Sequence, residues 1–286
     1  MMELRLIFRF PRAAVLLLAI VATGCASVMH KATRQFADNL STAILNENDS
    51  GTVRDGMPAY LLLIDGLIQG DPENADTLLA GAKLYGAYAG GFVTEIERGK
   101  RLAQRAYEYA RRATCLRRKL LCEALGRPFE TLSAALNAAG KDDLDLLFGL
   151  GSAWAGRIQQ ASDDWNAIAD IPKVQAIFEH VIALDAGYEQ GAPYMYLGVL
   201  NSLRPASLGG KPELGRENFE RAIALSNGLN LMAKTLYAQY YARLVFDQVL
   251  HDRLLGEVLA AAPEAPKLTL LNTLAQQRAK ALLDSG

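Results

Sequence analysis

The chain has 286 residues, of which 51% are apolar and 21% charged, and its formal net charge is −1. This apolar content is too high for a disordered chain and suffices for the core of one large domain or of a repeat array. Nucleic-acid-binding proteins usually have an excess of lysine and arginine over acidic residues. This chain has no such excess, so we expect no nucleic-acid partner.

Residues 1–24 have the parts of a lipoprotein signal peptide. Three arginines, Arg5, Arg9 and Arg12, precede an unbroken apolar run from 13 to 22. A basic start, a short apolar core and small residues before the cut are the parts of a secretory signal. The run is about half of the ~20 residues that a transmembrane helix requires, so it does not predict a permanent span.

The stretch Ala22-Thr23-Gly24-Cys25 resembles the bacterial lipobox, whose cysteine receives diacylglycerol, although Leu is usual where Ala22 stands. We expect cleavage before Cys25, lipidation of its thiol and anchoring to a membrane. The alternative is an ordinary signal peptide that ends at a cysteine. Cleavage changes the net charge from −1 to −3, because three arginines and one glutamate leave. Ala26 replaces the Asp that favours retention in the inner membrane, so we expect the periplasmic face of the outer membrane.

Beyond the signal, residues 25–45 are expected to form a lipid-anchored tether and an N-terminal helix, and residues 46–286 a single helical domain. Apolar residues recur at helical spacing in four later stretches. These stripes are Leu144, Leu147, Phe148, Gly151, Trp154 and Ile158; Val174, Ile177, Phe178 and Val181; Leu229, Met232, Ala233, Leu236 and Tyr240; and Leu254, Leu255, Val258 and Leu259. Alternating strand-like runs are scarce, so the spacing predicts an all-α fold.

The two remaining cysteines, Cys115 and Cys122, are an even pair in an oxidising compartment. A straight helix would separate them by about 10.5 Å along its axis. A disulfide requires Cα atoms within roughly 7 Å of each other. We therefore expect a bridge only if the helix breaks between the two cysteines; two buried free thiols are the alternative.

Breaks recur along the chain and predict helical hairpins stacked in series. They fall at Gly70-Asp71-Pro72, Gly90-Gly91, Gly140, Gly187, Gly209-Gly210, Asn227-Gly228 and Pro263 to Pro266. The tetratricopeptide pattern has small residues at positions 8, 20 and 27 and an aromatic residue at position 24. Gly198, Gly215, Phe219 and Ala222 fit these positions. We expect degenerate tetratricopeptide-like hairpins stacked into one superhelical domain; a generic helical bundle is the alternative.

The hairpin turn from Arg204 to Pro212 has five residues more than a regular repeat. Prolines fix φ at its ends, and Gly209 and Gly210 allow backbone angles that other residues resist. This composition predicts one defined shape. Because scaffolds usually carry binding groups on loops, we expect Leu208, Gly209, Gly210 and Lys211 to form a binding surface. The alternative is that the turn only covers the ends of neighbouring helices.

This turn and its flanks resemble the T-component family (TatT) of tripartite ATP-independent periplasmic (TRAP) transporters. The resemblance covers nearly all of the mature chain and includes the lipobox. The residues that carry it are Tyr196-Leu197-Gly198, Pro205, Leu208 to Glu213, Phe219 to Ile223, Asn230 to Lys234, Tyr240 to Arg243, Leu270 to Asn272, Leu84-Tyr85 and Tyr88-Ala89. The block from 196 to 243 is the specific part.

The resemblance implies a tetratricopeptide-like periplasmic lipoprotein without catalytic activity. It implies association with the substrate-binding protein of a TRAP transporter, delivery of an acidic or apolar organic ligand, and trimers with a channel through each subunit. The resemblance also leaves open a role apart from any transporter. The alternative function is therefore a general envelope adaptor that binds no small molecule.

No catalytic or metal-binding motif is present. The patterns H-E-x-x-H, G-x-S-x-G and C-x-x-C are missing, and His30, His180 and His251 lie far apart in sequence. We expect no enzyme activity, metal or cofactor.

Two further groups are candidates for a partner or ligand surface. The basic stretch from 98 to 119, which includes Arg111 and Arg112, would attract an acidic partner or anionic ligand. Its alternative is a solvated helix face. Tyr237, Tyr240 and Tyr241, together with the two tryptophans Trp154 and Trp165, would line a ligand cavity, or else pack in the core.

Overall fold

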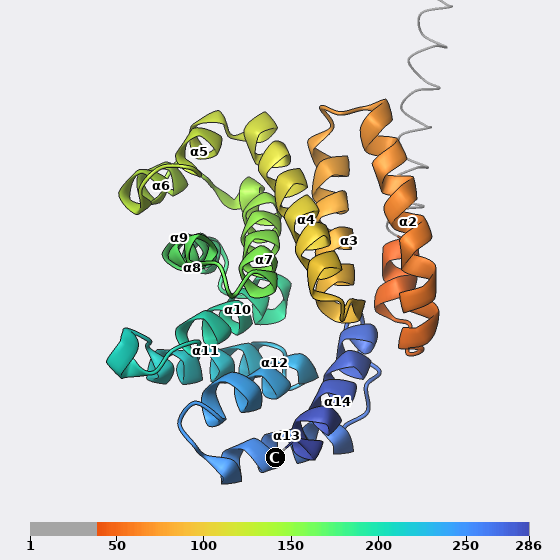
Figure 1. Cartoon of the computed structure of the whole chain (residues 1–286), viewed down its shortest axis with the longest axis vertical. Helices are drawn as coiled ribbons and strands as arrows, with labels where there is room; N and C mark the ends of the chain where they lie inside the picture. Colours follow the sequence, from red (N-terminus) through yellow and green to blue (C-terminus); the bar gives the residue numbers. More distant parts are fainter. Residues whose placement is uncertain (1–38, 286) are drawn as a thin grey trace, which may run out of the picture.

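The computed structural model describes residues 39–285, and they form helices joined by short turns (Figure 1). The signal peptide 1–24, Cys25 and His30 lie outside the described residues. A short helix at 39–45 precedes α2 (Ser50–Gly70), α3 (Ala75–Phe92), α4 (Ile96–Arg117), α5 (Lys119–Ala124), α6 (Phe129–Leu136), η1 (Lys141–Asp143), α7 (Leu144–Gln160), α8 (Trp165–Ala169), α9 (Ile171–Leu184), η2 (Tyr188–Gly191), α10 (Ala192–Asn201), η3 (Ala206–Leu208), α11 (Pro212–Leu225), α12 (Leu231–Leu236), η4 (Tyr237–Ala242), α13 (Gln248–Ala260) and α14 (Thr269–Asp284). The predicted all-α fold is confirmed.

Several of these helices begin where a short polar side chain satisfies a backbone N–H of the first turn. Asp49 accepts a hydrogen bond from the N–H of Gly51 at 2.9 Å before α2. Asn74 accepts from Thr77 before α3, and Asp247 accepts from Leu250 before α13. Such caps stabilise a helix by about 1 kcal/mol each, and they set where these helices start.

One predicted break is wrong. Gly90 and Gly91 lie within the last turn of α3, which ends at Phe92. A Cβ atom on Gly91 would come within 3.3 Å of Leu274 Cδ1, so the glycine lets α14 approach α3 closely. The chain turns only after Phe92, before α4 begins at Ile96.

Two predicted stripe residues are exposed instead of buried. Leu229 is 48% exposed because it lies in the turn before Asn230, whose side chain caps α12. Leu259 is 42% exposed because Val258 beside it takes the buried position in the last turn of α13.

The core consists of two clusters of buried apolar side chains. The larger joins α2 through α9 and also includes Leu197 and Leu200 of α10 and Leu270 of α14; the smaller joins α10 through α14 with η4. Tyr196 and Leu274 pack against both clusters and connect them. Tyr196 stacks on Phe178 with ring centroids 4.7 Å apart. The hairpins therefore share one continuous apolar interior.

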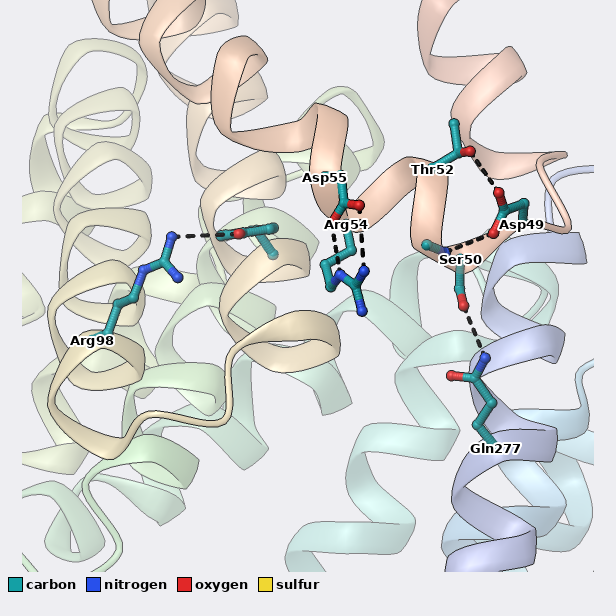
Figure 2. A network of polar contacts seen from close by, with 9 residues as sticks. Asp49, Ser50, Thr52, Arg54, Asp55, Arg98 and Gln277 are labelled. Atoms are coloured by element: carbon teal, nitrogen blue, oxygen red, sulfur yellow. Dashed lines mark hydrogen bonds and ion pairs between the residues drawn. The ribbon is translucent and has the colours of Figure 1, made fainter.

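The last helix returns to the first hairpin (Figure 1). Gln277 on α14 donates a hydrogen bond to the Ser50 hydroxyl at 2.8 Å, as Figure 2 shows. The backbone N–H of Lys267 donates to Asn46 Oδ1 at 2.7 Å. The stack of hairpins thus closes on itself. Within 39–285, none of the helices combines the length and apolarity that crossing a bilayer requires.

The hairpin of α10 and α11 packs through the small residues that the repeat pattern singles out. A Cβ atom on Gly198 would come within 2.7 Å of the Phe219 ring, and one on Gly215 within 2.1 Å of Ser202 Oγ. Both glycines therefore permit close contact between the two helices. This packing is of the helical-hairpin kind; the tetratricopeptide detail stays a prediction.

Candidate functional site

The turn between α10 and α11, residues 202–211, includes all of the predicted turn Arg204 to Pro212 except Pro212, which begins α11, and it has one defined backbone path. The carbonyl oxygen of Pro205 accepts hydrogen bonds from the N–H groups of Leu208 at 2.9 Å and Gly210 at 3.1 Å. The N–H of Lys211 donates to the carbonyl of Asn201 at 3.0 Å, which closes the base of the turn. The carboxamide of Asn201 is itself held, because it accepts a hydrogen bond from Gln175 on α9. The turn is therefore built as a rigid loop.

The two glycines in this turn are needed for different reasons. Gly209 has φ of 78°, in the left-handed region that favours glycine. Gly210 lacks a positive φ, but a Cβ atom there would lie 1.7 Å from the carbonyl oxygen of Arg204. The expectation that both relieve backbone angles holds for Gly209 only; Gly210 provides space. Leu208 is 66% exposed and Lys211 is exposed beside it.

The tyrosines of η4 attach this π-helical segment to α11. The Tyr237 hydroxyl donates to Glu220 Oε1 and the Tyr241 hydroxyl to Glu213 Oε1, each at 3.1 Å. Burial raises the pKa of both phenols, and the neighbouring carboxylates raise it further. Tyr237 also stacks on Phe219, with centroids 5.3 Å apart. Tyr240 is half-buried against the same cluster. These side chains pack the core and bind α11 through their hydroxyls.

The two tryptophans are separated. Trp154 is 1% exposed in the larger core cluster, whereas Trp165 is 83% exposed at the start of α8, so the two do not line one cavity.

The two histidines in the described residues contact groups of the protein itself. His180 contacts the carbonyl of Ala139 at 3.1 Å, and the buried His251 contacts Asp252 at 2.8 Å. No group of three or more His, Cys, Asp or Glu side chains within 39–285 is arranged to hold a metal ion.

Carboxylates from other elements neutralise part of the basic stretch from 98 to 119. Arg105 pairs with Asp65 of α2 at 2.9 Å, Lys100 with Asp163 at 3.1 Å, and Arg117 with Asp76. Arg118 pairs at 2.7 Å with Asp143, whose side chain is 5% exposed. Arg98 donates to the Tyr88 hydroxyl at 3.4 Å (Figure 2). These side chains therefore attach α4 to its neighbours.

The side chains of Arg111 and Arg112 lie in different environments, one in solvent and the other in a cleft. Arg111 is exposed to solvent. Arg112 donates to the carbonyl of Pro72 at 2.9 Å and lines a cleft of about 300 Å³ between α2 and α4. Asp65 and Arg105 line the same cleft. Asp65 cannot be predicted as a site residue from the sequence, since nothing in the local pattern links this residue of α2 to an arginine 40 positions later.

Cys115 and Cys122 form a disulfide in the structure, with Cα atoms 4.7 Å apart. The helix breaks between them, because α4 ends at Arg117 and α5 begins at Lys119. Arg118, at φ −139° and ψ 80°, lies outside the helical region and turns the chain. This break shortens the distance that a continuous helix would impose.

We expect mass spectrometry of unreduced peptides to recover Cys115 linked to Cys122. The double variant Cys115→Ser/Cys122→Ser should lose about 2–3 kcal/mol of unfolding free energy, because the bridge closes a short loop in the unfolded chain. Chemical denaturation of the oxidised and reduced wild type gives the matched comparison. Two separately alkylated thiols in freshly isolated protein would contradict the bridge.

Comparison with protein families matches residues 46–286 to the model of the TRAP transporter T-component family. A search of curated proteins gives no match. The matched region starts before α2 and includes every helix from α2 to α14, the turn at 202–211 and the cleft between α2 and α4. The chain therefore belongs to the TRAP transporter T-component family, which links it to TRAP transport.

Proposed function

We propose that this chain is a non-catalytic lipoprotein that binds the substrate-binding protein of a TRAP transporter. In this role it assists the uptake of a small organic ligand, acidic or apolar. The family match over nearly the whole helical domain carries the proposal, because it links the chain to TRAP transport. The proposal includes a homotrimer, as the family resemblance implies.

The anchoring part of the proposal depends on the sequence from 1 to 26. Cleavage before Cys25 and lipidation of its thiol would hold the helical domain at the periplasmic face of the outer membrane. The substrate-binding protein would then meet the anchored domain within the periplasm.

The turn at 202–211 supports a protein partner. Its backbone is fixed by hydrogen bonds before binding, so little backbone entropy is lost on contact. It presents an exposed leucine beside an exposed lysine. Leu208 offers apolar area, and Lys211 offers a charge to an acidic surface.

Changing only these two side chains tests the partner. The variant Leu208→Ser/Lys211→Ser keeps Gly209 and Gly210, so the turn retains its backbone path. We expect its affinity for the substrate-binding protein to fall by about tenfold or more, as for central interface residues. Surface plasmon resonance with the substrate-binding proteins of the same cell measures this, and circular dichroism checks helix content.

The control is Lys280→Ser/Leu283→Ser, which removes another exposed lysine and leucine, these two on α14. Its affinity should equal that of the wild type. Equal affinities for both double variants would show that the turn only covers helix ends. Wild-type protein that binds none of the substrate-binding proteins would contradict the TRAP partner and favour the general envelope adaptor.

A further inference from the structure

The cleft between α2 and α4 combines apolar walls with two guanidinium groups. Its volume of about 300 Å³ is at the lower end of small-molecule sites, which span roughly 300–1,000 Å³. Ile68 and Pro72 supply apolar surface on one side, and the ring of Tyr109 lies among the groups on the other. Arg105, Tyr109 and Arg112 recur at helical spacing, so α4 presents them on one face.

Asp65 fixes one end of the cleft. Its Oδ1 accepts a hydrogen bond from the Tyr109 hydroxyl at 2.7 Å. Its Oδ2 accepts from the Tyr85 hydroxyl at 2.8 Å and from Arg105 Nη1 at 2.9 Å. Burial, and then the bond to Asp65, raises the pKa of the Tyr109 phenol, which therefore stays a donor. Asp65 thus holds Arg105 in place, and three donors already occupy its oxygens.

The two arginines keep donors for a ligand. Arg105 uses Nη1 for both Asp65 and Tyr85, and Arg112 uses Nη2 for the carbonyl of Pro72. A guanidinium carries five N–H donors. Among the residues that the structure describes, the other nitrogens of these two groups have no hydrogen-bond acceptor. Arg112 also lies over the Tyr109 ring, 5.8 Å from its centroid, which restricts the guanidinium.

The charges in the cleft favour one negative charge on the ligand. Arg105 and Arg112 bring two positive charges against the single carboxylate of Asp65, so one positive charge is left uncompensated. A monoanion neutralises it. A dianion, such as the doubly charged form of phosphate, would add repulsion from Asp65. A planar carboxylate also has two oxygens that can accept two parallel N–H bonds from one guanidinium, which an acceptor with one oxygen cannot do.

We propose that this cleft binds a small monocarboxylate. Its carboxylate would lie between Arg105 and Arg112, and its apolar body against Ile68, Pro72 and the face of Tyr109. The proposal deepens the proposed function, because it names the chemical class of the ligand. Only the source of the ligand, uptake through a TRAP transporter, rests on the proposed function.

Isothermal titration calorimetry on the full chain in detergent tests the site with four probes. These are benzoate, 4-methylpentanoate, the neutral isostere benzamide, and inorganic phosphate. We expect both carboxylates to bind the wild type at least about tenfold more tightly than benzamide and phosphate, because only they offer a planar monoanion. This comparison needs no variant. Benzamide or phosphate binding as tightly as benzoate would overturn the proposal.

The variants Arg112→Gln and Arg111→Gln place the site on the structure. Arg112→Gln should weaken benzoate binding about tenfold or more, since a charge-assisted contact is lost. Arg111→Gln removes the same charge from the adjacent exposed position and should leave binding unchanged. Equal loss in both variants, or in neither, would overturn the site. Because the titration uses the isolated chain, it gives the same answer whether or not a substrate-binding protein binds the turn at 202–211.

Discussion

Replacing Phe219 by alanine should lower the free energy of unfolding by about 3–5 kcal/mol, the usual cost of removing a fully buried phenylalanine. Phe219, on α11, is 0% exposed and packs against α10 and η4. Its ring stacks on Tyr237 on one side and faces Gly198 on another. Gly198 has no side chain to move into the space, so we expect the cavity to stay open and the cost to be near the top of this range.

Urea denaturation followed by far-UV circular dichroism measures the loss. Phe246→Ala is the matched control, because it removes the same side chain from a position that is 93% exposed. Its free energy of unfolding should change by no more than about 0.5 kcal/mol. A loss below about 1 kcal/mol for Phe219→Ala would mean that α10 and α11 do not pack through Gly198 as the structure has them.

Local spacing predicted the helices well and their contacts poorly. The stripe at 144–158 became α7 because its apolar residues recur once per helical turn, a property of the sequence alone. The pair Gly90-Gly91 predicts a break because glycine often ends a helix. The role of Gly91 depends on Leu274, which lies on a helix at the far end of the chain, whereas nothing lies within 4 Å of where a Cβ atom on Gly90 would be. Nothing near residue 90 in the sequence contains that information.

The same limit applies to the candidate sites. The sequence predicts a disulfide only if the helix breaks between the two cysteines. It does not predict that the break falls at Arg118. The basic stretch looked like an exposed positive face because its own neighbours hold few acids. Asp65, Asp76, Asp143 and Asp163, which pair with it, come from other elements. Long-range ion pairs follow from the packing of helices, and local periodicity does not predict that packing.

The variant Cys25→Ser should lose labelled palmitate completely and leave the membrane fraction. The expectation rests on the lipobox-like Ala22-Thr23-Gly24-Cys25. The thiol is the only group in this stretch that a diacylglycerol transfer would modify, and serine lacks it. Each buried methylene contributes about 0.8 kcal/mol to membrane affinity, so losing two or three acyl chains removes firm anchoring altogether.

Cys115→Ser/Cys122→Ser is the control, because it removes the other cysteines and should keep both the label and the membrane position. Ala26→Asp tests the destination: the labelled protein should move from outer- to inner-membrane fractions on a density gradient, since Asp after the lipidated cysteine favours retention. Equal labelling of wild type and Cys25→Ser would contradict lipidation and leave an ordinary signal peptide. Labelled Ala26→Asp protein that stays in the wild-type fraction would contradict the sorting argument alone, because lipidation and sorting depend on different residues.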